Sequence, residues 1–188
     1  MLIIAYLGTS VKEYLEKAQG MVAGLGMCCP KHPEKRMAFH DTYPRTIKET
    51  GEKIDIQRLI CYECRSTIAI LPDFLLPNKH YSANEIESVI LQSEAGSSVY
   101  DIDTAAAVCT VRRWLSGIPE KLTEQVSKLK SLAIENYACP ISEVTHKDLS
   151  LMEQIRHISQ RLPKIRYSGN LLGYAGIYSQ SLAAANST

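Results

Sequence analysis

Apolar positions recur at two different periods along this chain, and the period changes near residue 80. Before that point, Leu2 to Leu7 and Ser66 to Leu71 are short apolar runs closed by glycine or proline, which predicts strands. Between them, residues 43–60 contain two β-capable arms around Thr50-Gly51, a pair typical of hairpin turns. A helix about Val11 to Gln19 is expected after the first strand. The first part of the chain should therefore be rich in β-structure.

Beyond residue 81 the apolar positions recur at helical spacing. Ser82 and Glu85 form a capping box at the start of the first helix. An alanine-rich helix and a second helix, ended by Gly117 and Pro119, are expected to meet at a tight corner after Ala107. The predicted helices cover Ala83 to Gln92, the alanine-rich segment before Ala107, Thr110 to Gly117, Glu120 to Tyr137 and Asp148 to Leu162. The tail from Tyr167 is rich in Gly, Ser, Ala and Tyr and is expected to be flexible.

Composition narrows the class of protein. Hydrophobic residues make up 45% of the 188 residues and charged residues 22%, which is typical of a soluble globular protein. No apolar run approaches the roughly 20 residues of a membrane helix, and the opening MLIIAYLG lacks the basic leader and cleavage site of a signal peptide. We therefore expect a cytoplasmic protein with no membrane partner. The net charge of +1 does not mark a nucleic-acid binder, so such a role must rest on local features.

Two short motifs carry the strongest chemical signal. Six cysteines in a cytoplasmic chain favour metal binding over disulfides, because the cytosol keeps thiols reduced. Cys29-Pro-Lys-His32 and Cys61-Tyr-Glu-Cys64 each place two zinc-type ligands on one turn, separated by two residues. The hairpin between the motifs can return the second turn to the first. We predict one structural Zn²⁺, held by Cys29, His32, Cys61 and Cys64 in a small zinc ribbon.

Other interpretations of these residues stay open at this point. The cysteines could be separate buried or surface thiols, and Cys28 or His40 could replace one of the four ligands. A catalytic zinc would keep one position open for water and would need a general base, for which Glu63 is the obvious candidate. Four filled positions favour a structural ion instead. Cys109 and Cys139 have no partner at metal spacing and are expected to be small core residues.

The segment from Thr110 to Leu115 has the pattern of a recognition helix. In a helix-turn-helix unit the first helix braces the second, which presents polar and basic side chains to the major groove of DNA. The side chains expected to contact DNA are Thr110, Arg112, Arg113 and Lys121. Arginine suits guanine edges and phosphates because its planar fork donates paired hydrogen bonds. An ordinary helical hairpin with solvated arginines fits the same spacing.

Five stretches of this sequence together resemble one protein family. They are CPKH, YPRTIKETGEKIDI, CYEC, AILPDFLLPNKHYSANEIESVI and TVRRWL, spread over roughly Cys28 to Leu115. The family consists of bacterial proteins of unknown function, often found with transposons and other mobile elements, in which a zinc-binding knuckle is joined to a helix-turn-helix. The resemblance implies a DNA-binding accessory or regulatory protein of a mobile element, with Cys29, Cys61 and Cys64 matching the ligand pattern. His32 departs from the pattern, since a cysteine is expected there, and the usual glycine at the helix-turn-helix corner is missing.

These observations together predict an α+β protein in three parts. Residues 1–80 would form the N-terminal strand, a helix and the zinc ribbon, residues 81–166 the helix-turn-helix with further helices, and residues 167–188 a flexible tail. The expected function is non-enzymatic DNA binding, with double-stranded DNA as the partner. A transposase or recombinase is a second expected partner, and the added helices could mediate formation of a homodimer.

Two alternatives come from other functional classes. One is a protein-docking adaptor, in which the ribbon binds a transposase rather than DNA. The other is a recombinase or nuclease subunit, which would need carboxylates that converge on metal ions. The sequence offers acidic residues such as Asp101, Asp103 and Glu120. Their spacing does not indicate that they converge on a metal ion.

Overall fold

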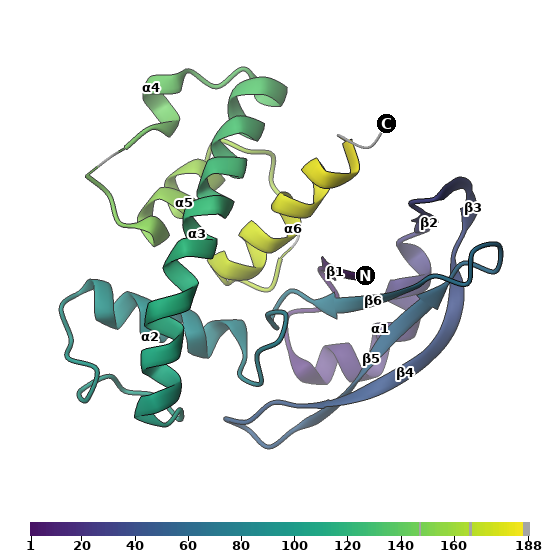
Figure 1. The fold of residues 1–188 in the computed structure, drawn as a ribbon, viewed down its shortest axis with the longest axis horizontal. Helices are drawn as coiled ribbons and strands as arrows, with labels where there is room; N and C mark the ends of the chain where they lie inside the picture. Colours follow the sequence, from purple (N-terminus) through teal and green to yellow (C-terminus); the bar gives the residue numbers. More distant parts are fainter. Residues whose placement is uncertain (147, 166, 186–188) are drawn as a thin grey trace.

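The computed structural model describes residues 1–146, 148–165 and 167–185, and a sheet precedes a group of helices in it (Figure 1). The α+β class is therefore confirmed. The strands are β1 (Leu2–Ala5), β2 (Cys28–Cys29), β3 (His32–Arg36), β4 (Ala38–Thr46), β5 (Lys53–Ile60) and β6 (Thr67–Pro72). The helices are α1 (Val11–Gly24), α2 (Ala83–Glu94), α3 (Val108–Tyr137), α4 (Ile141–Val144), α5 (Leu151–Ser159) and α6 (Leu171–Ala185).

A four-stranded sheet in the order β1-β6-β5-β4 forms the first half of the molecule. The predicted hairpin is present, because β4 and β5 pair antiparallel from Ala38 opposite Ile60 to Thr46 opposite Lys53. Gly51 in the hairpin turn has a φ of +73°, a left-handed conformation that glycine adopts without steric cost. β1 pairs in parallel with β6 at the other edge, so the opening apolar run of the chain completes the sheet.

Helix α1 contributes one apolar face to the core beside the sheet. Tyr14, Ala18 and Val22 are buried at four-residue spacing. The Tyr14 ring packs edge-on against Phe74, and its hydroxyl donates a hydrogen bond to the carbonyl oxygen of Asp55 at 2.7 Å. Burial raises the pKa of Tyr14 to about 12, so the hydroxyl keeps its proton and this hydrogen bond at neutral pH.

Helix α3 is the longest helix of the second half and runs for 30 residues without a break. The prediction that a helix ends at Gly117 and Pro119 is wrong, since both residues lie inside α3. The buried side chains form one stripe along the helix, and they are Val111, Trp114, Ile118, Leu122, Val126, Leu129, Leu132 and Ala133. Packing of this stripe against α5 and α6 outweighs the one backbone hydrogen bond that proline, which has no amide hydrogen, cannot donate.

Replacement of Pro119 by alanine is expected to stabilise the protein. Pro119 is exposed in the interior of α3, so alanine restores a backbone hydrogen bond without disturbing buried contacts. The free energy of unfolding should rise by about 1–3 kcal/mol, after allowing for the greater freedom of the unfolded chain. Urea denaturation measures the change, with Ser116→Ala as the control at a neighbouring exposed position that already has its amide. A lower denaturation midpoint for Pro119→Ala would contradict this expectation.

The alanine-rich segment is not helical. Residues 95–107 form a loop between α2 and α3, so the prediction of a helix there is wrong. Side chains of α2 form hydrogen bonds with this loop. The Glu85 carboxylate accepts hydrogen bonds from the Thr104 hydroxyl at 2.6 Å and the Ala105 amide at 2.7 Å, and Gln92 bonds both backbone groups of Asp103. Within the described residues, the first helix of the predicted helix-turn-helix is therefore not formed.

The predicted flexible tail is largely helix α6. Its buried side chains belong to the helical core, and they are Leu171, Leu172, Tyr174, Ala175 and Tyr178. The Asn170 side chain accepts a hydrogen bond from the Gly173 amide at 2.5 Å, and Glu87 of α2 accepts from the Leu171 amide at 2.7 Å. These two acceptors fix the start of the helix. The composition of the tail alone gives no sign that Glu87 is one of them. Residues 186–188 of the predicted tail lie outside the described part of the chain.

Helix α6 also joins the two halves of the molecule. It lies between the helical group and β1 (Figure 1), and Ile177 packs against the core of the sheet. The first strand and the last helix are therefore in contact although they lie at opposite ends of the sequence. Among the described helices, none has an apolar stretch long enough to cross a bilayer.

Candidate metal centre

Two turns bring four donor side chains together. Cys29 ends β2 and His32 begins β3, and these two residues pair across the short β2–β3 hairpin. Cys61 follows β5 directly, and Cys64 lies in the turn that leads to β6. The β4–β5 hairpin returns the chain from the first turn to the second, in agreement with the expectation from spacing. All four donor atoms lie within 4.8 Å of one another.

Three separations between the donor atoms can be compared with the edges of a tetrahedron around one ion. Cys29 Sγ lies 3.6 Å from Cys64 Sγ and 3.9 Å from His32 Nδ1, and Cys61 Sγ lies 3.7 Å from His32 Nδ1. With zinc bonds of about 2.3 Å to sulfur and about 2.0–2.1 Å to nitrogen, tetrahedral edges are about 3.8 Å between sulfurs and about 3.6 Å from sulfur to nitrogen. These three separations are close to the edges of a zinc tetrahedron, and all six cysteines are free thiols.

Backbone amides and one hydroxyl group surround the thiols of the second turn. The amides of Cys64 and Glu63 bond to Cys61 and lower the pKa of its thiol. The Ser66 hydroxyl lies 3.1 Å from Cys64 Sγ and, with the Ser66 amide, lowers the pKa of Cys64 to about 6. Hydrogen bonds to sulfur favour the thiolate, which is the form that binds a metal. The second turn is thus suited to hold negative charge on sulfur.

Protons compete with a metal more strongly at the first turn. Cys29 is 1% exposed, and this burial raises the pKa of its thiol. The hydrogen bond with Cys61 raises the pKa of His32. A metal needs deprotonated thiols and a neutral imidazole, so binding would displace protons from both residues. The affinity of the site for a metal should therefore fall as the pH falls.

Removal of the Ser66 hydroxyl is expected to weaken metal binding. In Ser66→Ala the pKa of Cys64 should rise, so that protons compete better for this sulfur. The affinity of the site for zinc should drop about tenfold, which is the lower end of the effect of residues that hydrogen-bond a metal ligand. The loss of affinity should grow as the pH is lowered towards about 6, the pKa of Cys64. Competition with a chromophoric chelator over a range of pH measures it. Ser97→Ala, in the exposed α2–α3 loop, is the matched control, and equal affinities for both variants would contradict the role of Ser66.

The residues that could have replaced a ligand lie outside the group. Cys28 is exposed, although it is the immediate neighbour of a donor. His40 lies on β4, with Nε2 at 3.9 Å from the Asp41 carboxylate. Glu63, the candidate general base of a catalytic zinc, pairs with Lys35 at 3.5 Å, and both side chains are more than half exposed. Among the described residues, the four predicted ligands are the set that comes together.

The other two cysteines differ from each other. Cys109 is exposed near the start of α3, so the prediction of a core position is wrong for it. It precedes the buried Val111 by two residues, which places its side chain roughly 200° away around the helix. Cys139 is half-buried and packs against the helical core.

The predicted DNA-contacting residues lie on two sides of α3. Three of them lie on one side of the helix, because Arg113 follows Thr110 by three residues and Lys121 follows Arg113 by eight. Arg113 and Lys121 are exposed there and Thr110 is half-buried. Arg112 lies on another side, where its guanidinium stacks 5.2 Å from the centre of the Tyr100 ring and donates to the Tyr100 hydroxyl. Contact of these residues with DNA stays a prediction.

Two neighbours of the candidate site residues, Ser66 and Lys79, were not predicted from the sequence. Ser66 could have been found, because a hydroxyl two residues after a ligand can bond the sulfur. Lys79 could not, since its proximity to Arg113 and Lys121 of α3 arises only in the folded chain.

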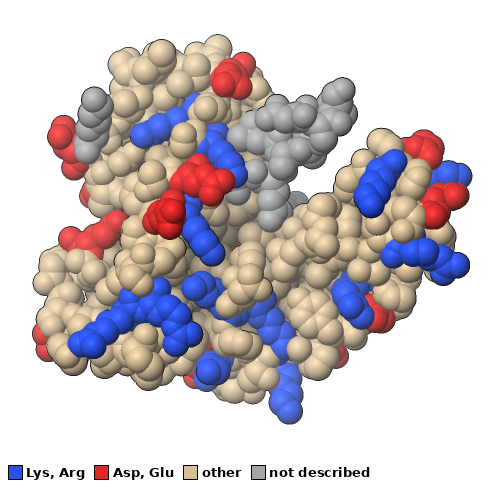
Figure 2. Space-filling model, viewed as in Figure 1, with Lys and Arg blue, Asp and Glu red and all other residues tan. Residues whose placement is uncertain are grey.

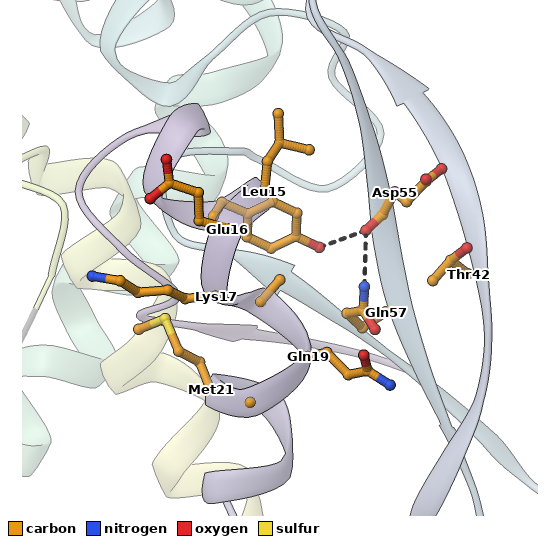
Figure 3. A pocket seen from close by; sticks show the side chains of 11 residues that line it. Leu15, Glu16, Lys17, Gln19, Met21, Thr42, Asp55 and Gln57 are labelled. Atoms are coloured by element: carbon orange, nitrogen blue, oxygen red, sulfur yellow. Dashed lines mark hydrogen bonds between the residues drawn. The ribbon is translucent and has the colours of Figure 1, made fainter.

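An open groove of about 630 Å³ lies between α1 and strands β4 and β5 (Figure 3). Met21 of α1 and Thr42 of β4 line its two sides. The Tyr14 hydroxyl and the Gln57 side-chain amide both donate to the Asp55 carbonyl oxygen, at 2.7 and 3.4 Å, as the dashed lines in Figure 3 show. These polar groups therefore satisfy the backbone of β5.

Comparison with known proteins finds a family model that is similar to part of the chain. Residues 28–114 match the model of a family described as "Domain of unknown function (DUF6431)". The match runs from β2 into α3 and contains all four donor residues, in agreement with the resemblance over the same stretch. The association with mobile elements stays a prediction. No curated protein and no solved structure matches the chain.

Proposed function

We propose that this chain is a zinc-binding, DNA-binding accessory or regulatory protein, in which the zinc ion is structural and no reaction is catalysed. The observation that carries the proposal is a group of three thiols and one imidazole whose donor atoms all lie within 4.8 Å of one another. Tetrahedral sets of sulfur and nitrogen donors favour zinc, whereas calcium and magnesium prefer six or more oxygen ligands.

The surroundings of the donors support a structural ion. Four protein donors fill a tetrahedral zinc and leave no position for a reacting water. In β3, every residue after His32 is exposed, and in β2 only Cys29 is buried. Apolar burial therefore contributes little to this small ribbon, and metal binding would supply the folding free energy that the burial does not.

The exposed cations of α3 support DNA binding. Arg113 and Lys121 extend from one side of the helix into solvent. A guanidinium bonds phosphates or guanine edges in pairs, and an ammonium acts as a point charge near phosphate. The role in a mobile element rests on the sequence resemblance alone.

Two measurements test this proposal. Elemental analysis of the purified protein should find one zinc ion per chain, and metal-free folded protein would contradict the zinc part. Electrophoretic shift assays should detect DNA binding that weakens steeply as salt rises, because phosphate contacts release counterions. Failure to shift DNA at low salt would contradict the DNA part and favour a protein-docking adaptor. Cleavage of DNA with added magnesium would favour a recombinase or nuclease subunit.

A further inference from the structure

Three cations from distant parts of the sequence meet where the two halves of the molecule join. Lys79, in the loop after β6, and Lys121 of α3 line the same groove of about 190 Å³, together with Leu76, Pro77 and Gln125. Arg113 precedes Lys121 by eight residues on the same side of α3. Burial, and then the positive charges of Lys121 and Arg113, lower the pKa of Lys79. We name Lys79, Arg113 and Lys121 the basic seam.

The helix side of the seam is open to a close approach. Arg113, Gly117 and Lys121 follow one another at four-residue spacing, so they line one side of α3 over roughly 12 Å. Gly117 lies between the two cations, and a Cβ added there would meet nothing within 4 Å. A large anion can therefore reach the surface of the helix between Arg113 and Lys121.

The loop side of the seam is held in place by the sheet. Arg45 of β4 donates hydrogen bonds to the carbonyl oxygens of Leu76, at 2.7 Å, and of Lys79. The Lys48 amide donates to the carbonyl oxygen of His80 at 2.8 Å. The backbone of Lys79 is thus bonded on both sides, and its ammonium group extends from a fixed position beside α3.

The charge of the seam is not balanced by acids. None of the ion pairs within the described ranges involves Lys79, Arg113 or Lys121. Glu124, one turn beyond Lys121, is bound by Lys128 at 2.6 Å. Figure 2 shows Lys and Arg side chains gathered over the N-terminal half of α3 and the junction with the sheet. The whole chain carries a net charge of only +1, so this concentration of positive charge is local.

We infer that the basic seam is the surface that contacts the phosphate backbone of double-stranded DNA. The inference rests on the proposed DNA-binding function. It adds which surface of the protein contacts the phosphates of the DNA. Cations spread over roughly 12 Å fit a polyanion better than one small anion, since duplex DNA carries one charge per about 1.7 Å of its axis. The contact would use both halves of the molecule, with Lys79 from the loop after the sheet and two cations from α3.

Neutralisation of the seam tests the inference. The triple variant Lys79→Gln, Arg113→Gln, Lys121→Gln should bind a mixed-sequence DNA duplex more weakly than the natural protein. The slope of log affinity against log salt should fall by about 2.7, or about 0.9 for each lost phosphate contact. Lys12→Gln, an exposed lysine of α1 outside the seam, is the charge control and should leave the slope unchanged. Thermal unfolding verifies that all variants are folded.

The outcomes separate this inference from the function on which it rests. If the natural protein binds no duplex at any salt, the DNA-binding function and the seam both fail. If it binds with a steep salt dependence that the triple variant retains, DNA binding stands and the seam is wrong. The natural protein could also bind a single strand of the same sequence with the same salt slope as the duplex. If the triple variant loses that slope, the assignment of the seam to a duplex is overturned. A slope reduced in the triple variant and preserved in Lys12→Gln supports the seam.

Discussion

Cys61→Ser is expected to abolish stoichiometric zinc binding and to unfold the two turns that carry the donors. Cys61 is 1% exposed, and its sulfur lies 3.7 Å from His32 Nδ1 of the other turn, so one substitution removes a link between the turns. Structural zinc contributes apparent free energies of about 10–16 kcal/mol to small zinc domains at neutral pH. Loss of a donor should therefore have a larger effect than any other single change in this chain.

Elemental analysis and circular dichroism measure the effect of Cys61→Ser. Cys28→Ser is the matched control, because it makes the same chemical change at an exposed thiol next to the donor Cys29. It should retain one zinc ion per chain and the same thermal unfolding temperature. Retention of a full equivalent of zinc by Cys61→Ser, or its loss from Cys28→Ser, would contradict the ligand set.

Gly173→Ala is expected to lower the free energy of unfolding by about 3 kcal/mol, the upper end of the usual cost of overpacking. A Cβ at this position of α6 would lie 2.2 Å from the carbonyl oxygen of Asp73 and 2.7 Å from Oδ1 of Asn170. The first of these atoms belongs to the backbone at the end of β6, so it cannot move aside cheaply. The helix would have to shift away from the sheet.

Gly20→Ala is the control for Gly173→Ala. Gly20 also lies inside a helix, α1, but a Cβ there would meet nothing within 4 Å. Alanine should therefore stabilise the protein by about 0.5–1 kcal/mol, because it restricts the unfolded chain and favours the helix. Urea denaturation should move the two midpoints in opposite directions. A stabilised Gly173→Ala would show that α6 does not pack closely on the end of β6.

Two carboxylates explain why α6 docks so closely. The Asp73 carboxylate accepts a hydrogen bond from the Ser168 amide at 2.6 Å, just before the helix. Glu87 accepts from the first amides of α6, where the helix dipole also favours a negative charge. Burial raises the pKa of both carboxyl groups. The end of the sheet and helix α2 thus hold the N-terminus of α6 from two sides.

The stretch that matches the family model does not complete the core by itself. Residues 28–114 lack β1, which pairs with β6, and α1, which carries the buried Tyr14. They also lack most of α3 and the whole of α6. The residues outside the match therefore complete both cores, and Lys121 of the basic seam lies among them. The four donors and Lys79 lie inside it.

The sequence by itself determined the parts of this protein that depend on neighbouring residues. The two pairs of ligands and the Thr50-Gly51 turn appear where the pattern predicted them. Of the predicted capping box, Ser82 caps α2, but Glu49 and not Glu85 accepts from the Ser82 amide. Each turn, cap or pair of donors forms within a few residues, although the two donor pairs meet only through the β4–β5 hairpin. Local spacing is therefore enough to predict them.

Only the tertiary structure decided the features that depend on distant contacts. The path of α3 through Pro119 follows from packing against α5 and α6, and the alanine-rich loop follows from its bonds to Glu85 and Gln92. The docking of α6 requires Glu87, more than 80 residues away. The basic seam requires the loop after β6 to reach α3. Long-range packing and hydrogen bonds override local propensity at these places, because together they contribute more free energy than a single helix-breaking residue costs.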